Sequence, residues 1–85
     1  MKSALQTQKI GFIGCGAMAS ALAGGLARMG IPLDQMCAAD PDLSQRERFA
    51  SSLGIRTLAD NSALVEQSEI VVLCVKPVMV VRVLS

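Results

Sequence analysis

Short apolar runs alternate along the chain with stretches in which apolar residues recur every three or four positions. The runs are typical of buried parallel strands, and the longer period is typical of helices that pack on them. The predicted strands span residues 8–14, 35–39, 55–58 and 69–75. The predicted helices span residues 17–29, 43–53, 61–67 and 78–84. Strands and helices in alternation predict an α/β fold with a parallel sheet and flanking helices.

Residues at the ends of these elements agree with the predicted boundaries. Gly54 follows the second helix, where a left-handed cap is expected. Asn61 is suited to cap the third helix, and Pro77 is suited to begin the fourth. Gly24 and Gly25 each cost the first helix about 1 kcal/mol relative to Ala. We expect a close approach of this helix to the sheet to compensate for that cost.

Composition limits the chain to one domain and to a small set of partners. Its 85 residues fall short of the roughly 100 to 150 of a typical complete domain. Hydrophobic residues make up 52% of it and the net charge is +1, with basic residues scattered from Lys2 to Arg82. Segment 10–27 is uncharged but rich in glycine, and its apolar part is too short for an export signal or a membrane span. We therefore expect neither nucleic acid nor a membrane as a partner.

The three cysteines are predicted to be reduced. Cys15, Cys37 and Cys74 are odd in number, far apart and embedded in apolar runs, as in a cytoplasmic protein without disulfides. Cys37 and Cys74 lie inside predicted strands, which favours a packing role. Cys15 lies in a turn, where partial exposure is expected. The chain has no His to activate a thiol, and no metal site is predicted.

A glycine motif joins the first predicted strand to the first predicted helix. Residues 14–19 read G-x-G-x-x-A. Gly14 permits a tight turn, Gly16 leaves room for a pyrophosphate against the backbone, and Ala19 lets the helix pack closely on the strand. Free backbone N–H groups and the helix dipole would stabilise the anion. Although ordinary Gly-rich turns share this pattern, its context predicts an incomplete Rossmann-type sheet of about four strands that binds NADP or NAD.

Two charged residues at strand ends are further candidates. Asp40 ends the second predicted strand, where an acid can contact the adenosine ribose, but before Pro41 it is equally suited to a turn. A carboxylate there favours NAD, whereas Arg46 and Arg48 lie near enough in sequence to offset it, so the coenzyme preference stays open. Lys76 could place its charge near the nicotinamide. The pattern alone favours packing of its stem on apolar surface with the ammonium in water.

Three segments together resemble the amino-terminal region of pyrroline-5-carboxylate reductase. They are residues 9–19 (KIGFIGCGAMA), 23–26 (AGGL) and 75–77 (VKP). The resemblance implies reduction of 1-pyrroline-5-carboxylate to L-proline by NADPH or NADH, the last step of proline biosynthesis. It also implies that residues 1–85 are the amino-terminal part of an NAD(P)-binding domain and that the family's later helical dimerisation domain is absent. The full-length protein is then expected to be a cytoplasmic homo-oligomer.

The same resemblance implies which residues contact the cofactor. The turn residues would line the pyrophosphate, the acid after the second strand would meet the ribose or its phosphate, and Asn61 would meet the adenosine. The end of the last predicted strand would run beside the nicotinamide. The implied set is Ile13, Gly14, Cys15, Gly16, Ala17, Met18, Asp40, Asn61, Cys74, Val75, Lys76 and Pro77. No catalytic residue is assigned. Family members vary in polarity at Ala17 and Asp40, so phosphate selectivity does not transfer.

Two other classes of function stay open. One is another NAD(P)-dependent oxidoreductase, of the β-hydroxyacid dehydrogenase or deazaflavin-dependent reductase type. The other is a non-catalytic dinucleotide-binding module. In the leading hypothesis the chain holds cofactor contacts without a complete active site, so we expect it to be inactive and only marginally stable alone.

Overall fold

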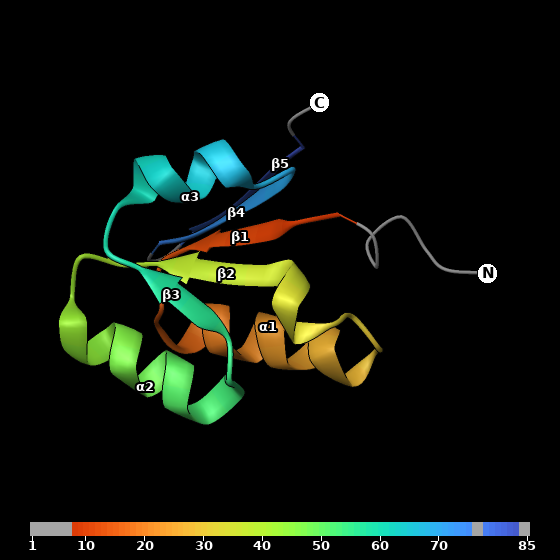
Figure 1. Cartoon of the computed structure of the whole chain (residues 1–85), viewed down its shortest axis with the longest axis horizontal. Helices are drawn as coiled ribbons and strands as arrows, with labels where there is room; N and C mark the ends of the chain where they lie inside the picture. The colour runs from red at the N-terminus through yellow and green to blue at the C-terminus, as the bar shows by residue number, and fades with distance from the viewer. Residues whose placement is uncertain (1–7, 76–77, 84–85) are drawn as a thin grey trace.

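Helices cover both faces of a five-stranded sheet in the part of the chain that the structure describes (Figure 1). The computed structural model describes residues 8–75 and 78–83. The strands are β1 (Ile10–Ile13), β2 (Met36–Ala39), β3 (Arg56–Leu58), β4 (Ile70–Val75) and β5 (Val78–Val83). The helices are α1 (Ala17–Arg28), α2 (Leu43–Leu53) and α3 (Asn61–Gln67), and a 3₁₀ turn, η2 (Leu33–Gln35), precedes β2.

The sheet has the order β3-β2-β1-β4-β5, in which β1 to β4 run parallel. Ile10 of β1 is in register with Met36 of β2 and with Ile70 of β4, so the carboxyl ends of these strands share one edge. Helices α1 and α2 cover one face and α3 covers the other (Figure 1). The predicted α/β Rossmann-type fold is confirmed, because the first four strands have the order of a doubly wound dinucleotide-binding sheet.

The prediction of a helix over 78–84 is wrong. Residues 78–83 form β5, which pairs antiparallel with β4 from Ile70 opposite Val83 to Val75 opposite Val78. The segment reads VMVVRV, and β-branched residues favour strands over helices. The outer edge of β4 supplies the backbone partners that a strand needs. Lys76 and Pro77, which was expected to begin the helix, lie outside the described residues.

The core has two layers, one on each face of the sheet. On the face of α1 and α2, Phe12 of β1 and Phe49 of α2 are both buried, with 0% and 1% of their surface exposed. On the other face, Leu64 of α3 packs with Cys37 and Ala39 of β2. Alternate residues of β1 and β2 thus point to opposite layers, as the pleat of a strand requires.

Two helices begin at aspartates that cap them. Asp42 accepts hydrogen bonds from the backbone N–H groups of Ser44 and Gln45 at the start of α2. Asp60 accepts from the Ser62 N–H at the start of α3, at 2.9 Å. Asn61 is therefore the first residue of α3 and not its cap, so that prediction was wrong by one position. Asp and Asn are about equally good caps, and their order in the chain does not decide between them.

The expected close approach of α1 to the sheet at Gly24 and Gly25 is not observed. A Cβ atom on Gly24 would lie 3.6 Å from Leu53 of α2 and from Arg28, an ordinary contact distance. A Cβ atom on Gly25 would lie 4.0 Å from the nearest atom, again on Arg28. A glycine of the sheet does approach another element closely, but it is Gly11 of β1, and the element is α3. A Cβ atom on Gly11 would overlap the side chain of Ser68 at the end of α3.

Candidate cofactor-binding site

An open groove of about 330 Å³ lies at the carboxyl ends of the parallel strands. Six of the residues predicted to contact a cofactor line it: Ile13, Gly14, Gly16, Asp40, Asn61 and Cys74. They come from β1 and the turn after it, from the end of β2, from α3 and from β4. Ligands of open α/β sheets bind at this edge, where the strand order reverses. Here that point lies between β1 and β4. The chain continues from β1 to β2 and β3 on one side of it, and from β4 to β5 on the other side.

The other predicted residues lie elsewhere. Ala17 and Met18 are exposed in the first turn of α1, next to the groove residues in sequence. Cys15 turns into the core with 2% of its surface exposed, so the expected partial exposure is wrong. Val75 ends β4, and the Lys76–Pro77 dipeptide lies outside the described residues.

Three residues that line the groove were not predicted from the sequence: Ala39, Pro41 and Gln45. Ala39 and Pro41 flank Asp40, and Gln45 lies in the first turn of α2. Their position at the end of a strand and at the start of the next helix was the available signal, because these segments meet at the binding edge of such a sheet. Neither an alanine nor a proline carries chemistry that would have drawn attention to it.

Gly14 is required by the backbone of the turn. Its φ angle is +111°, a conformation that other residues rarely adopt, and its N–H donates to the Ala39 carbonyl at 2.7 Å. A Cβ atom there would lie 2.7 Å from the carbonyl oxygen of Cys74. The missing side chain thus lets β1, β2 and β4 meet at one point.

Gly16 has no such structural reason to be glycine. Its backbone is extended, with φ −83° and ψ −165°, which any residue can adopt. A Cβ atom on Gly16 would meet nothing within 4 Å. The space that the absent side chain leaves opens into the groove, which fits a ligand that lies against the main chain.

The start of α1 offers backbone donors toward this space. Its first hydrogen bond runs from the Ser20 N–H to the Gly16 carbonyl at 3.0 Å, so the amides of Ala17, Met18 and Ala19 have no acceptor within the helix. No side chain caps α1, and its first turn contains no acidic residue. With the positive end of the helix dipole, these amides form a seat for an anion such as a pyrophosphate.

The Asp40 carboxylate connects two loops of the groove. Its Oδ2 accepts from the Cys15 N–H at 3.0 Å, and its Oδ1 accepts from the Asp42 N–H at 2.9 Å. The amides of Gly14 and Cys15 are therefore bound within the protein and are not among the free N–H groups of the motif. Asp40 thus shapes the turn before α2 and also lines the groove.

Arg46 is bound to the backbone of the same turn. Its Nη1 donates to the carbonyl oxygens of Asp40 at 2.8 Å and of Pro41 at 3.2 Å. Asp42 lies beside it with an exposed carboxylate, and hydrogen bonds from Ser44 hold the pKa of that carboxyl below its usual value. The turn after β2 thus presents carboxylate oxygens outward and keeps its arginine on main-chain oxygens.

The thiols near the groove are protonated at neutral pH. Burial, reinforced by the Asp40 charge, raises the pKa of Cys15 from 9.0 to about 11. Burial also raises the pKa of Cys74. Both thiols, and that of Cys37, are free in the structure, which agrees with the predicted absence of disulfides. Neither Cys15 nor Cys74 is therefore poised as a nucleophile.

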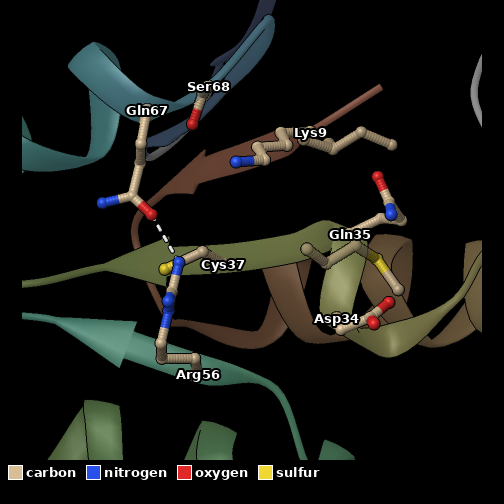
Figure 2. Close-up of a pocket in the computed structure, with 9 residues that line it drawn as sticks. Lys9, Asp34, Gln35, Cys37, Arg56, Gln67 and Ser68 are labelled. Atoms are coloured by element: carbon tan, nitrogen blue, oxygen red, sulfur yellow. Dashed lines mark hydrogen bonds between the residues drawn. The ribbon is translucent and has the colours of Figure 1, made fainter. Parts of the chain in front are cut away.

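A second pocket, of about 130 Å³, lies at the amino ends of the strands (Figure 2). Lys9 and Arg56 bring positive charge to it, and the Arg56 guanidinium donates to the Gln67 side chain (Figure 2). This edge lies opposite the one at which α/β sheets bind their ligands. It therefore does not compete with the groove as the cofactor site.

The described parts of the chain contain neither a metal-binding cluster nor a membrane-spanning helix. No group of three or more His, Cys, Asp or Glu side chains there could hold a metal ion. None of the helices described there has the length and apolar character needed to cross a membrane.

The parallel sheet, the glycine turn and the uncapped helix define a Rossmann-type dinucleotide-binding unit. Residues 9–85 match the family described as NADP oxidoreductase coenzyme F420-dependent. The chain belongs to this family, which supports the prediction of NADP or NAD as its cofactor.

Individual relatives agree with the predicted resemblance. The chain is 41% identical over 73 residues to a pyrroline-5-carboxylate reductase of Pseudomonas aeruginosa, covering 86% of this chain and 27% of that protein. It is 40% identical over 82 residues to one of Methanosarcina acetivorans, covering 95% of this chain and 30% of that protein. A solved pyrroline-5-carboxylate reductase from Coxiella burnetii superposes with a TM-score of 0.76 at 34% identity, covering 84% of this chain and 26% of that one. The chain thus spans less than a third of the length of these relatives.

Proposed function

We propose that the chain is the amino-terminal, cofactor-binding part of a pyrroline-5-carboxylate reductase. Such an enzyme reduces 1-pyrroline-5-carboxylate, a small-molecule substrate, to L-proline at the expense of NADPH or NADH. The observation that carries the proposal is the open space at Gly16 in front of the uncapped start of α1. The similarity to pyrroline-5-carboxylate reductases over most of the chain supports the particular reaction.

In this proposal each predicted residue has a place along the cofactor. The turn from Ile13 to Met18 holds the pyrophosphate, chiefly through main-chain amides, and Asp40 accepts from the adenosine ribose. Asn61 contacts the adenosine, and the segment 74–77 runs beside the nicotinamide. When bound, the nicotinamide supplies the hydride that reduces the C=N bond. The residues of this chain bind and orient the cofactor, and none of them is assigned a proton transfer.

The wider setting is part of the same proposal. Residues 1–85 form the first portion of an NAD(P)-binding domain, and a later helical domain supplies the substrate pocket and the contacts between subunits of a homo-oligomer. The protein works in the cytoplasm and binds neither nucleic acid nor a membrane. The scattered basic residues and the free cysteines support these expectations.

Binding and turnover measured on one sample test this proposal. Calorimetry of the chain should detect binding of NADH or NADPH, and an absorbance assay with 1-pyrroline-5-carboxylate should detect no oxidation of the cofactor. Failure of both dinucleotides to bind at millimolar concentration would contradict the proposal. Turnover by the chain alone would contradict the absence of a complete active site.

A second candidate is an oxidoreductase that uses a deazaflavin. The family description, which names coenzyme F420, is the observation that favours it. Titration of the same sample with coenzyme F420 separates the candidates. Binding of this coenzyme in addition to NADP would favour the second, and binding of the nicotinamide cofactor alone would favour the reductase.

A further inference from the structure

Asp40 lines the ribose end of the groove, and the turn that follows it carries a second carboxylate, Asp42. The nearby Arg46 donates through Nη1 to main-chain oxygens of this turn. From this arrangement we infer that the site selects NADH over NADPH, with Asp40 and Asp42 excluding the 2′-phosphate by charge. The inference rests on the proposed function, because it concerns which dinucleotide the same groove accepts. It settles a question that the sequence left open, since Arg46 was as well placed in the sequence to bind that phosphate as the aspartates were to repel it.

Asp40 lies at the position that contacts the 2′ group of the adenosine ribose, which is the group in which NADH and NADPH differ. In dinucleotide-binding sheets the residue at the end of the second strand contacts the adenosine ribose, and an acid there accepts from the 2′-hydroxyl. Asp40 follows β2 directly and lines the groove. Each of its oxygens accepts one backbone hydrogen bond, at 3.0 Å from Cys15 and 2.9 Å from Asp42. A carboxylate oxygen can accept two, so both can still accept from a ribose hydroxyl.

Asp42 occupies the donors that a 2′-phosphate would need. The start of a helix binds a phosphate through its first free amides. At the start of α2, Asp42 Oδ1 already accepts from the Ser44 N–H at 3.0 Å, from the Ser44 hydroxyl at 2.9 Å and from the Gln45 N–H at 3.4 Å. A 2′-phosphate would have to displace this carboxylate and then lie beside it.

Arg46 offsets only part of these charges, because one cation faces two carboxylates. Its Nη1 holds the carbonyl oxygens of Asp40 and Pro41, and this pair of contacts stabilises the turn that carries both carboxylates. These contacts occupy Nη1, so only the Nε and Nη2 groups of the guanidinium remain for another acceptor. Gln45, which faces the groove from α2, is neutral. Arg48, the other cation that the sequence offered, is exposed one turn or more beyond the start of α2.

Calorimetric titration of the chain with NADH and NADPH at low ionic strength tests the inference. We expect NADH to bind at least about tenfold more tightly, because a doubly charged phosphate beside carboxylates is strongly disfavoured when salt screening is weak. The variant Asp42→Asn removes one charge and keeps a good helix cap. It should raise the ratio of NADPH to NADH affinity by about threefold to tenfold.

Two control variants separate this local effect from net charge. Asp34→Asn makes the same change at the opposite edge of the sheet, where Asp34 is exposed in η2, and should leave the ratio as it is. Arg48→Ala removes a charge that acts on Asp42 and should lower the ratio by less than Asp42→Asn raises it. A loss of NADPH affinity in Arg48→Ala that exceeds the gain in Asp42→Asn would show that this cation serves the 2′-phosphate, and it would overturn the inference.

The outcomes distinguish the inference from the proposal on which it rests. Equal or tighter binding of NADPH by the parent chain overturns the coenzyme preference and leaves the dinucleotide site in place. Binding of neither coenzyme overturns both. An increase in the ratio that is as large in Asp34→Asn as in Asp42→Asn refutes the role of the turn after β2.

Discussion

The Cys15 N–H donates to Oδ2 of Asp40 at 3.0 Å and so fastens the turn after β1 to the end of β2. The two residues are 25 positions apart in the chain. The same carboxylate receives the Asp42 N–H through its other oxygen, so one side chain fixes two of the loops that border the groove. Asp40 is in this respect a positioning residue as well as a candidate contact to the ribose.

Replacement of Asp40 should therefore loosen the groove even without a ligand. Asp40→Ala leaves two backbone donors without their acceptor, and we expect the free energy of unfolding to fall by about 1 to 3 kcal/mol. Asp40→Asn retains one acceptor oxygen and should cost less. Urea denaturation followed by circular dichroism measures both. An unfolding free energy within about 0.5 kcal/mol of the parent value for Asp40→Ala would show that the link contributes nothing, since surface changes commonly stay in that range.

Gly16→Val should separate binding from folding. The extended backbone and the open space around Gly16 admit a side chain without strain. The free energy of unfolding should therefore fall by about 1 kcal/mol at most, because valine is a poorer residue than glycine at the N-cap of a helix. The valine would occupy the space in front of α1, and dinucleotide affinity should fall below detection by calorimetry. Gly14→Val is the matched comparison, because its positive φ and its contact with Cys74 predict loss of the fold. Equal affinity in Gly16→Val and the parent would refute the proposed seat for the pyrophosphate.

The glycines inside α1 should tolerate alanine. A Cβ atom at Gly24 or Gly25 meets neighbours only at ordinary contact distances. Each change to alanine should raise the free energy of unfolding by about 0.4 to 1 kcal/mol, because glycine lowers helix stability and adds freedom to the unfolded chain. Thermal or urea unfolding measures the gain. Gly11→Ala is the control and should destabilise, since its Cβ atom would overlap Ser68.

Cys15 should make stability fall with rising pH in the alkaline range. Its pKa is about 11 in the folded chain against 9.0 for an unperturbed thiol, so the folded state keeps the proton over an interval in which the unfolded state loses it. The folded state is thus favoured fully below pH 9 and loses that advantage as the pH rises toward 11. Urea titrations at several pH values should show a steeper alkaline decline for the parent than for Cys15→Ala. Parallel declines would mean that another group is responsible.

Much of the fold was predictable because its elements carry local signals. Every element predicted between residues 8 and 75 is found, within two residues of its predicted ends. The Leu43–Leu53 helix was predicted at its observed bounds, since its apolar residues recur at helical spacing and Gly54 marks its end. Residues 78–83 were not predictable in the same way. Their β-branched side chains favour a strand, whereas Pro77 before them suggested the start of a helix. The partner that decides between the two is the edge of β4, which is a tertiary feature.

The parts of the site that the glycine motif and the strand ends define were predictable. The hydrogen bonds of its side chains were not, because they depend on partners in other loops. The positions of Gly14 and Gly16 follow from the motif, and the structure separates their reasons: backbone conformation for the first and open space for the second. That Arg46 would bind main-chain oxygens and Asp40 would bind Cys15 depends on how the loops fold against each other. Spacing in the sequence carries no information about such contacts.

The contact of Gly14 with the Cys74 carbonyl has a mechanical consequence. It places the turn after β1 directly against the last residues of β4, with no side chain between them to absorb movement. A shift of either segment must be passed to the other. The pyrophosphate and the nicotinamide of a bound dinucleotide would thus rest on a single stiff junction, and a substitution that displaced one of them would misalign the other as well.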